Sequence, residues 1–200
     1  MRHRIIIFVL PVFLFLSMVI PHSLFAGEPR KLIMDAVERG LSIREEYSLD
    51  KPEERRKCEQ RIWAELSPIF DFEEMSKRAL GLYWKKRSPE EKKEFVKLFT
   101  ILLKNAYLGN ACASSGEKII YRGEKQESNY ASVQTKIITH TGAEVVADYR
   151  LFKNEGKWRI YDVIIEGVSF INNYRSQFYS VLSSSSYEDL VQKLKERGKD

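Results

Sequence analysis

The chain has 200 residues, of which 33 are lysine or arginine and 28 are aspartate or glutamate, giving a formal net charge of +5. This length is sufficient for one domain with a sizeable core, and the mild charge lacks the concentrated basic footprint of a nucleic-acid-binding protein. The three histidines and two cysteines show no metal-ligand spacing, so we expect neither a metal site nor another cofactor.

Residues 1–26 have the pattern of a secretory signal. Arg2 and Arg4 precede an almost wholly apolar stretch, and Ala26 is a small residue suited to cleavage before Gly27. An uncleaved membrane anchor is the alternative, but the apolar stretch is short for one and contains a proline. No cysteine lies near the cleavage point, which excludes lipid attachment there. Cleavage removes two arginines and no acid, so it would leave one exported domain, 27–200, with 31 basic and 28 acidic residues.

Four helices are predicted in the first part of this domain, between 29 and 108. Pro29 suits the first turn of a helix and is followed by apolar residues at helical spacing. A break at 48–52 precedes a highly charged second helix, which should end at Ser67-Pro68 because the residue before proline avoids the helical region.

The next two helices carry the clearest start signals. Asp71 with Glu74 predicts a capping box that opens the third helix, and Gly81 is suited to close it. Ser88-Pro89-Glu90-Glu91 combines an N-cap serine, a proline at the first position and a glutamate that reaches back. The fourth helix that follows has a broad apolar stripe.

After Gly109 the apolar period changes from helical to two, which predicts a sheet over 118–167. The strands are expected at 118–123, 130–139, 144–153 and 157–166. Short polar turns separate the later strands, so they must be antiparallel neighbours in a meander. Two closing helices, together spanning 170–197, complete an α+β fold with a four-stranded antiparallel sheet.

The strand from Lys157 has apolar residues on both faces. Strict alternation would place Trp158, Ile160, Asp162 and Ile164 on one face, and Arg159, Tyr161, Val163 and Ile165 on the other. Such a strand is covered on both faces, or one face lines a cavity. No nucleophile, base or metal cluster lies among these residues, which favours binding of an apolar ligand over catalysis.

Catalytic interpretations have little support. The GxSxG motif is absent, and His140, the one histidine that survives cleavage, lies at a predicted hairpin end where a solvated loop residue is expected. Asp148 and Asp162 could be acids with a raised pKa in an apolar pocket. We favour the alternative that they face solvent or pair with Arg150 and Arg159.

Cys58 and Cys112 leave two possibilities open. An even pair in an oxidising compartment favours a disulfide. The sequence cannot place the two Cα atoms within bridging distance, and Cys58 on a helix could simply be a small buried apolar residue.

Several motifs together resemble one family. They are Phe70-Asp71-Phe72, Ala79-Leu80-Gly81 with Trp84, Ser88-Pro89-Glu90-Glu91, Phe95 with Leu98 and Phe99, and the segment from Trp158 through Gly167-Val168-Ser169 to Asn173-Tyr174-Arg175-Ser176-Gln177-Phe178. From Leu32 to Arg197 the chain is similar to the MlaC family, also called toluene-tolerance proteins, which are periplasmic phospholipid carriers of Gram-negative bacteria. The two cysteines are not part of the family's pattern.

The resemblance implies a cone-shaped fold of the nuclear-transport-factor type, with a helical lobe and an apolar cavity. It implies a periplasmic, non-enzymatic carrier that shuttles diacyl phospholipid and maintains outer-membrane lipid asymmetry. Its partners would be an outer-membrane lipoprotein–porin complex and an inner-membrane ABC transporter with a lipid-capture subunit. A related branch linked to hopanoids leaves the lipid open. We expect a monomer.

Two other functions remain open at this point. One is an isomerase- or hydrolase-like enzyme that uses the same pocket, with Asp148 or Asp162 beside Tyr149 or Tyr161. The other is an envelope interaction protein whose interior is only core.

The predicted cavity lining comes from helices and from the sheet. The helical candidates are Met75, Leu80, Trp84, Phe95, Leu98, Phe99, Leu102 and Tyr107. The candidates from the sheet and the following turn are Val133, Tyr149, Tyr161, Val163, Ile165, Val168 and Phe170. A one-residue error in strand register would exchange the strand residues for their neighbours. Tyr174, Arg175 and Gln177 either serve the mouth of the pocket or anchor the last helices, and we favour anchoring.

Overall fold

The computed structural model describes residues 27–113 and 116–198, so the predicted signal lies outside the described residues. The helices and strands confirm an α+β fold, with helices first, an antiparallel sheet next and helices last. In chain order they are α1 (Glu28–Glu45), α2 (Pro52–Leu66), η1 (Ser67–Ile69), α3 (Phe72–Leu80), η2 (Gly81–Lys86), α4 (Pro89–Ala111), β1 (Lys118–Glu127), β2 (Tyr130–Ile138), β3 (Glu144–Asn154), β4 (Lys157–Ile165), β5 (Val168–Ser169), α5 (Phe170–Leu182) and α6 (Tyr187–Arg197).

The sheet has five strands in the order β1-β2-β3-β4-β5, so the prediction of four strands is wrong. The fifth strand is a two-residue segment, Val168–Ser169, that pairs with the end of β4. Glu166 and Gly167 both have positive φ, 48° and 78°, as a tight hairpin turn requires. Two residues are too few to show a period in the sequence, which is why the pattern missed this strand.

A bulge at Tyr161 changes which side chains of β4 face the helices. Leu151 pairs with Ile160, whereas Arg150 pairs with Asp162, so Tyr161 is the extra residue. Because paired residues share a face, Ile160 lies on the same face as Val163, which pairs with Tyr149. The strict alternation predicted for this strand is therefore wrong beyond Ile160.

The predicted helix starts are confirmed by their hydrogen bonds. Ser88 Oγ accepts from the Glu91 N–H at 3.2 Å, and the Glu91 carboxylate accepts from the Ser88 N–H at 2.7 Å. Asp71 accepts from the Glu74 N–H at 2.9 Å and so caps α3. The predicted reciprocal bond is wrong, because the Asp71 N–H donates to the Ile160 carbonyl at 2.8 Å and the Glu74 carboxylate pairs with Lys77 and Arg78. The local capping bonds fix the residues at which α3 and α4 begin.

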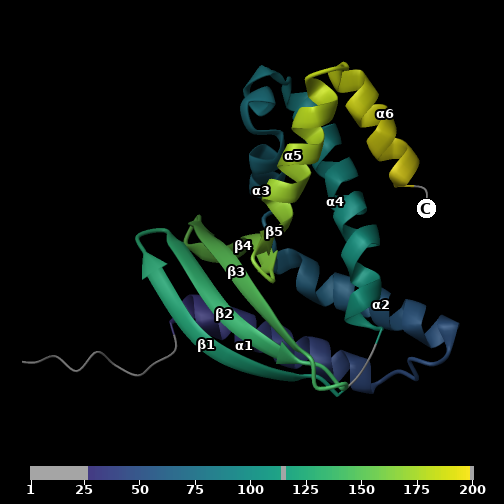
Figure 1. Cartoon of the computed structure of the whole chain (residues 1–200), viewed down its shortest axis with the longest axis vertical. Coiled ribbons are helices and arrows are strands. Elements are labelled where there is room, and N and C mark those ends of the chain that lie inside the picture. The colour runs from purple at the N-terminus through teal and green to yellow at the C-terminus, as the bar shows by residue number, and fades with distance from the viewer. Residues whose placement is uncertain (1–26, 114–115, 199–200) are drawn as a thin grey trace, which may run out of the picture.

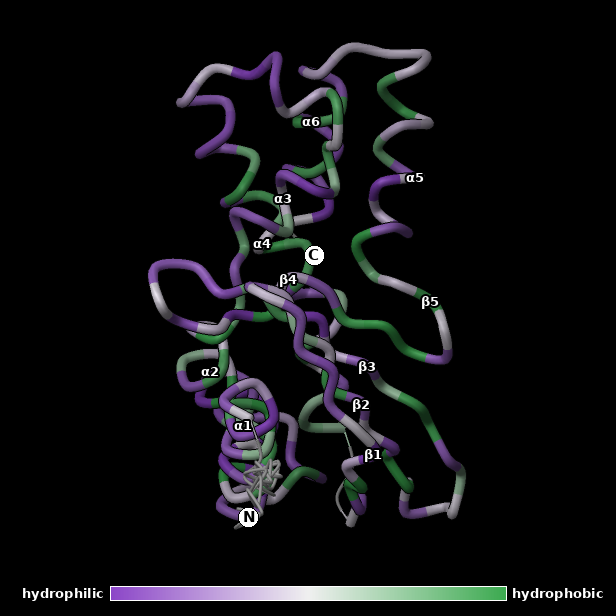
Figure 2. The backbone as a smooth tube through the Cα atoms, turned by 90° about the vertical axis from the view of Figure 1, so that its left-hand side faces the viewer, coloured by the Kyte–Doolittle hydropathy of each residue, from purple (hydrophilic) through white to green (hydrophobic). Residues whose placement is uncertain are grey.

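Two apolar layers meet in the middle of the molecule. Helix α1 lies against one face of the curved sheet (Figure 1), where Ile33 packs with Val133, Leu151 and Ile160. Helices α3, α4, α5 and α6 form a second cluster at the other end, built around Phe99. Figure 2 shows the molecule turned by 90°, with α1 and α2 on one side of the strands. The candidate site lies where these layers join.

Candidate apolar binding cavity

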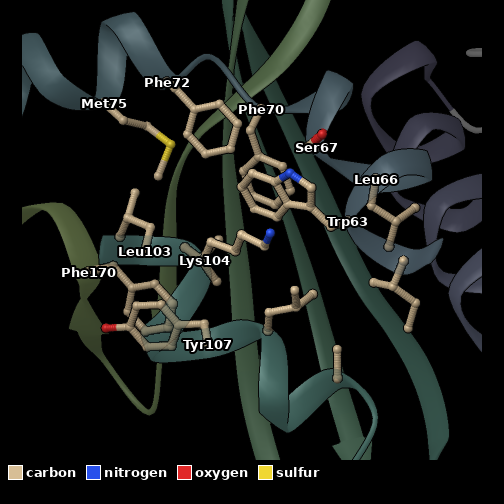
Figure 3. Close-up of a pocket in the computed structure, with 14 residues that line it drawn as sticks. Trp63, Leu66, Ser67, Phe70, Phe72, Met75, Leu103, Lys104, Tyr107 and Phe170 are labelled. Carbon is tan, nitrogen blue, oxygen red and sulfur yellow. The ribbon is translucent and has the colours of Figure 1, made fainter. Parts of the chain in front are cut away.

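A cavity of about 220 Å³ lies where α2, η1, α3, α4, β4 and α5 meet (Figure 3). Nearly every side chain that lines it is apolar or aromatic. The lining residues are Ile62, Trp63, Leu66, Ser67, Phe70, Phe72, Met75, Leu103, Lys104, Tyr107, Leu108, Ala111, Val163 and Phe170. A concave, apolar site with very few polar groups is typical of a small-molecule pocket.

Aromatic rings form two opposite walls of this cavity. The ring of Phe72 lies 5.6 Å from that of Trp63 and 5.8 Å from that of Phe70, measured between centroids. On the other side, the rings of Tyr107 and Phe170 stack with centroids 4.1 Å apart. These aromatic pairs contribute large apolar surfaces to both walls of the cavity.

Among the residues that the structure describes, Lys104 is the one charged residue that lines the cavity. Its Nζ lies 5.4 Å from the centroid of the Trp63 ring, within the range of a cation–π interaction. Figure 3 shows the lysine side chain directed toward this ring. The residue is only partly buried, so its charge lies at the rim where water still solvates it.

A second cavity, of about 310 Å³, lies between α1, α2 and the inner face of the sheet. It is lined by Ile33, Ala36, Val37, Gly40, Leu41, Arg44, Ile62, Leu66, Ile69, Phe70, Ala111, Ile119, Tyr149 and Ile160. Ile62, Leu66, Phe70 and Ala111 belong to both linings, and we call these four residues the common wall. Arg44, the charged member of the second lining, is paired with Glu117.

A disulfide lies next to the common wall. Cys58 of α2 is bonded to Cys112, the residue that follows α4, with Cα atoms 6.4 Å apart. Both cysteines are fully buried and pack with Ile62. Cys58 lies one turn before Ile62 and Cys112 follows Ala111, so the bond joins the two segments that carry this wall.

The fifteen predicted lining residues lie in three parts of the structure, namely the two cavities, the helical cluster and the sheet. Met75, Tyr107, Val163 and Phe170 line the first cavity, and Tyr149 lines the second. Six others belong to the helical cluster of α3 to α6 or pack against it, namely Leu80, Trp84, Phe95, Leu98, Phe99 and Leu102.

The remaining four predicted residues belong to the sheet. Val133 is buried beneath α1, and Tyr161 is the bulge residue and packs under the guanidinium of Arg78, 4.0 Å from its ring centroid. Ile165 and Val168 pair with each other at the hairpin end, where Val168 is 58% exposed. None of these four lines either apolar cavity.

The predicted set omitted most of the residues that make up the walls. The sequence of α4 does indicate part of this lining. Leu103, Tyr107 and Ala111 recur at intervals of four, so they share the face of the helix that lines the cavity. In α2 the signal was clearer still, since Ile62, Trp63 and Leu66 are the large apolar residues of an otherwise charged helix.

Neither candidate catalytic aspartate lines an apolar cavity. Asp162 is 2% exposed and accepts hydrogen bonds from Ser169 Oγ at 2.7 Å and from the Ile171 N–H at 3.1 Å. Its carboxylate lies 3.5 Å from Arg150, which confirms the predicted pairing with one of the two arginines. Asp148 pairs with Gln134 and Ile164 in the sheet, away from both cavities. His140 is exposed in the β2–β3 turn, as expected.

Several buried tyrosines around the two layers have a raised pKa. Burial raises the pKa of Tyr149 above its ordinary value. Burial also raises the pKa of Tyr174, whose ring lies 5.1 Å from that of Phe99 between centroids. This packing supports an anchoring role for Tyr174 in α5.

Within residues 27–113 and 116–198, no helix is both long and apolar enough to cross a membrane. The same part of the chain contains no group of three histidine, cysteine or acidic side chains that could hold a metal ion.

A curved antiparallel sheet and helices that enclose apolar cavities define the class of small α+β binding domains. The model of the MlaC protein family matches residues 35–196, and the chain belongs to this family.

Two relatives agree with this assignment. The chain is 26% identical over 137 residues to the intermembrane phospholipid transport system binding protein MlaC of Haemophilus influenzae, across 66% of this chain and 64% of that protein. It is 26% identical over 161 residues to the toluene tolerance protein ttg2D of Pseudomonas putida, across 79% of this chain and 71% of that protein.

The solved structure is a phospholipid-binding protein from Ralstonia solanacearum in complex with a phospholipid. The two structures superpose with a TM-score of 0.76 at 23% identity, over 86% of this chain and 98% of that one. At this identity the superposition confirms the fold.

Proposed function

We propose that this protein is a phospholipid carrier that holds acyl chains in the two apolar cavities and performs no chemical reaction. Membership of the MlaC family supports the proposal, as do the names of the relatives. The observation that carries it is the pair of apolar cavities, separated by only four side chains.

The energetics of such a site favour hydrocarbon. Each methylene removed from water contributes about 0.8 kcal/mol, so an acyl chain gains several kcal/mol on entering. Apolar cavities of about 150 Å³ stay dry and bind benzene, and both cavities here are larger, at about 220 and 310 Å³. Aromatic walls and Met75 tolerate chains of different shape, because they require no polar matching.

The common wall gives the proposal a specific geometry. Ile62, Leu66, Phe70 and Ala111 separate the cavities, and rotation of the larger side chains would connect them. A lipid with two chains would then place one chain on each side of Phe70. We propose this arrangement for a diacyl phospholipid.

The polar headgroup would remain at the rim near Lys104. Burying a phosphate without a compensating partner costs far more free energy than burying the acyl chains gains. The headgroup therefore stays in water. An ammonium at the rim is suited to a charge-assisted hydrogen bond with a phosphate oxygen. Met75, Tyr107, Val163, Phe170 and Tyr149 would contact the chains directly.

Of the other ten predicted residues, those in the helical cluster and the buried Val133 would support the site from behind, whereas Val168 is exposed at the hairpin end. Residues 27–200 would act as a single exported domain in the periplasm. There the carrier would exchange lipid with an outer-membrane lipoprotein–porin complex and with an inner-membrane ABC transporter. The family assignment supports this part of the proposal.

Native mass spectrometry of the protein purified from the periplasm of a Gram-negative host tests the proposal. We expect a bound mass that tandem fragmentation identifies as phospholipid. A chain that is purified without lipid and does not take up phospholipid from mixed micelles would contradict the proposed function.

A further inference from the structure

The end of the molecule formed by η2 and α5 exposes two large apolar side chains. Leu82 is 76% exposed and Tyr179 is 63% exposed, the highest values among the large apolar residues that the structure describes. They are far apart in the sequence but line one hollow of about 340 Å³, together with Lys86 and Arg175. Two large apolar side chains gathered in one hollow are a candidate interaction site, unlike single apolar residues scattered over a surface.

The backbone around these side chains is held firmly. Tyr83 contacts Tyr179 edge to face, with centroids 6.3 Å apart, and its hydroxyl donates to the Leu182 carbonyl at 3.4 Å. Gly81 has a φ of 55°, and a methyl group there would lie 3.2 Å from Arg175 Nε. The glycine therefore lets the guanidinium lie against the end of α3, where the helix dipole favours a cation.

Basic residues outnumber acidic ones around these side chains. The neighbouring hollow that Leu82, Lys85 and Arg175 also line contains Lys77, Arg78 and Arg150 against the acids Glu74 and Asp162. Lys85 and Lys86 are exposed on η2, and Arg175 is exposed on α5. Neither Gly81–Lys86 nor Phe170–Leu182 contains an acidic residue. Among the described residues, the nearby ion pairs involve Lys77, Arg78 and Arg87, and none involves these three cations.

We propose that Leu82, Lys85, Lys86, Arg175 and Tyr179 form a docking patch for the surface of an anionic bilayer. Leu82 and Tyr179 enter the boundary between headgroups and acyl chains, and the three cations contact lipid phosphates. A tyrosine suits this boundary because its ring is apolar and its hydroxyl is polar.

The small apolar area favours a membrane over a protein partner. A stable protein interface buries about 800 Å² on each side around an apolar core. Leu82 and Tyr179 are the large exposed apolar residues at this end, and the others that the structure describes, Ile120, Tyr130 and Val168, belong to the sheet. A bilayer requires no shape complementarity, so two protruding side chains with flanking cations are sufficient.

This inference does not depend on the occupant of the cavities, since none of the five residues lines either of them. The test is co-flotation of the mature chain with vesicles of equal parts phosphatidylcholine and phosphatidylglycerol, compared with vesicles of phosphatidylcholine alone. We expect association with the anionic vesicles that decreases as salt is added, because the Debye length shortens.

Two variants test the charged and the apolar residues of the patch separately. Lys85→Ala with Lys86→Ala should weaken association about 25-fold, on the basis of about fivefold for each cation at an anionic surface. Leu82→Ser should weaken it about tenfold through lost apolar burial. Lys93→Ala with Lys97→Ala and Ile120→Ser are the matched controls, since they change exposed lysines and an exposed isoleucine outside the patch.

Flotation that both patch variants retain at the wild-type level would overturn the proposal, as would a wild-type chain that ignores anionic vesicles at low salt. The second result would favour an acidic protein surface as the partner of this patch. Melting temperatures of the variants, measured by circular dichroism, show that they fold. Native mass spectrometry of the same samples separates this proposal from lipid carriage, because patch variants should keep their cavity lipid.

Discussion

The rings of Tyr107 and Phe170 stack almost parallel, with centroids 4.1 Å apart and an angle of 10° between their planes. Tyr107 belongs to the last part of α4, and Phe170 is the first residue of α5, directly after β5. This stack therefore joins the end of the sheet to the helical layer. It also closes one end of the first cavity, so the packing between layers and the width of the cavity depend on the same contact.

Filling the first cavity should expel lipid without unfolding the chain. Val163→Trp places an indole among Phe70, Tyr107 and Phe170, in space that an acyl chain would occupy. We expect the bound phospholipid measured by native mass spectrometry to decrease at least severalfold. Overpacking of this kind typically costs about 1–3 kcal/mol, so the chain should still fold. Ile120→Trp, at a partly exposed site on β1, is the control that should keep its lipid.

Lys104 offers a test of the proposed headgroup position. Lys104→Met keeps an apolar stem beside Trp63 but removes the charge, so the loss of a charge-assisted hydrogen bond should weaken phospholipid retention about tenfold. Fatty acid esters without a phosphate should bind equally to both proteins. Competition with a labelled phospholipid measures the difference. Lys97→Met, on an exposed part of α4, should have no effect, and an equal effect of both variants would contradict the assignment.

Features that depend on neighbours in the sequence could be predicted, and features that depend on tertiary partners could not. The capping box at Ser88 bonds residues three positions apart, so its motif is sufficient to place the start of α4. The bulge at Tyr161 arises where β4 pairs with β3, and nothing in the sequence of β4 marks it. That single residue reversed the predicted faces of half a strand.

The candidate site was only partly predictable for a related reason. Helix α4 is apolar around much of its surface, with Phe95 and Phe99 facing the other helices and Leu103 and Tyr107 facing the cavity. The sequence shows that all four are apolar but not which neighbour each will contact. The cavity is a space between elements, and its lining depends on how α2 crosses α4.

Removal of the disulfide should destabilise the chain. Cys58 and Cys112 are 54 residues apart, and closing a loop of that size stabilises a fold by about 4 kcal/mol in the chain-entropy model. Cys58→Ser with Cys112→Ser should lower the free energy of unfolding by a value near this one, measured by urea titration. Reductant should shift the wild type and leave the double variant unchanged. A wild type that is indifferent to reductant would show that the bond contributes nothing.

Asp162 should prove structural rather than catalytic. Asp162→Asn loses the ion pair with Arg150 and leaves Ser169 or Ile171 with a poorer acceptor, which should cost about 2 kcal/mol. Urea titration measures this change. Asp148→Asn is the matched control, because Asp148 Oδ1 has no hydrogen-bond partner among the described residues, so the substitution breaks no bond at that atom. Equal losses from both substitutions would contradict the structural role of Asp162.

Stability at alkaline pH should report on Tyr187. Burial raises its pKa from about 10 to about 12, and its hydroxyl donates to the Glu91 carbonyl at 3.1 Å. Between these two pH values the unfolded chain has lost the phenolic proton that the folded chain still holds, so stability decreases as pH rises through this window. Melting temperatures should therefore fall more steeply above pH 10 for the wild type than for Tyr187→Phe, which has no proton to lose. Parallel curves for the two proteins would show that another group carries the alkaline transition.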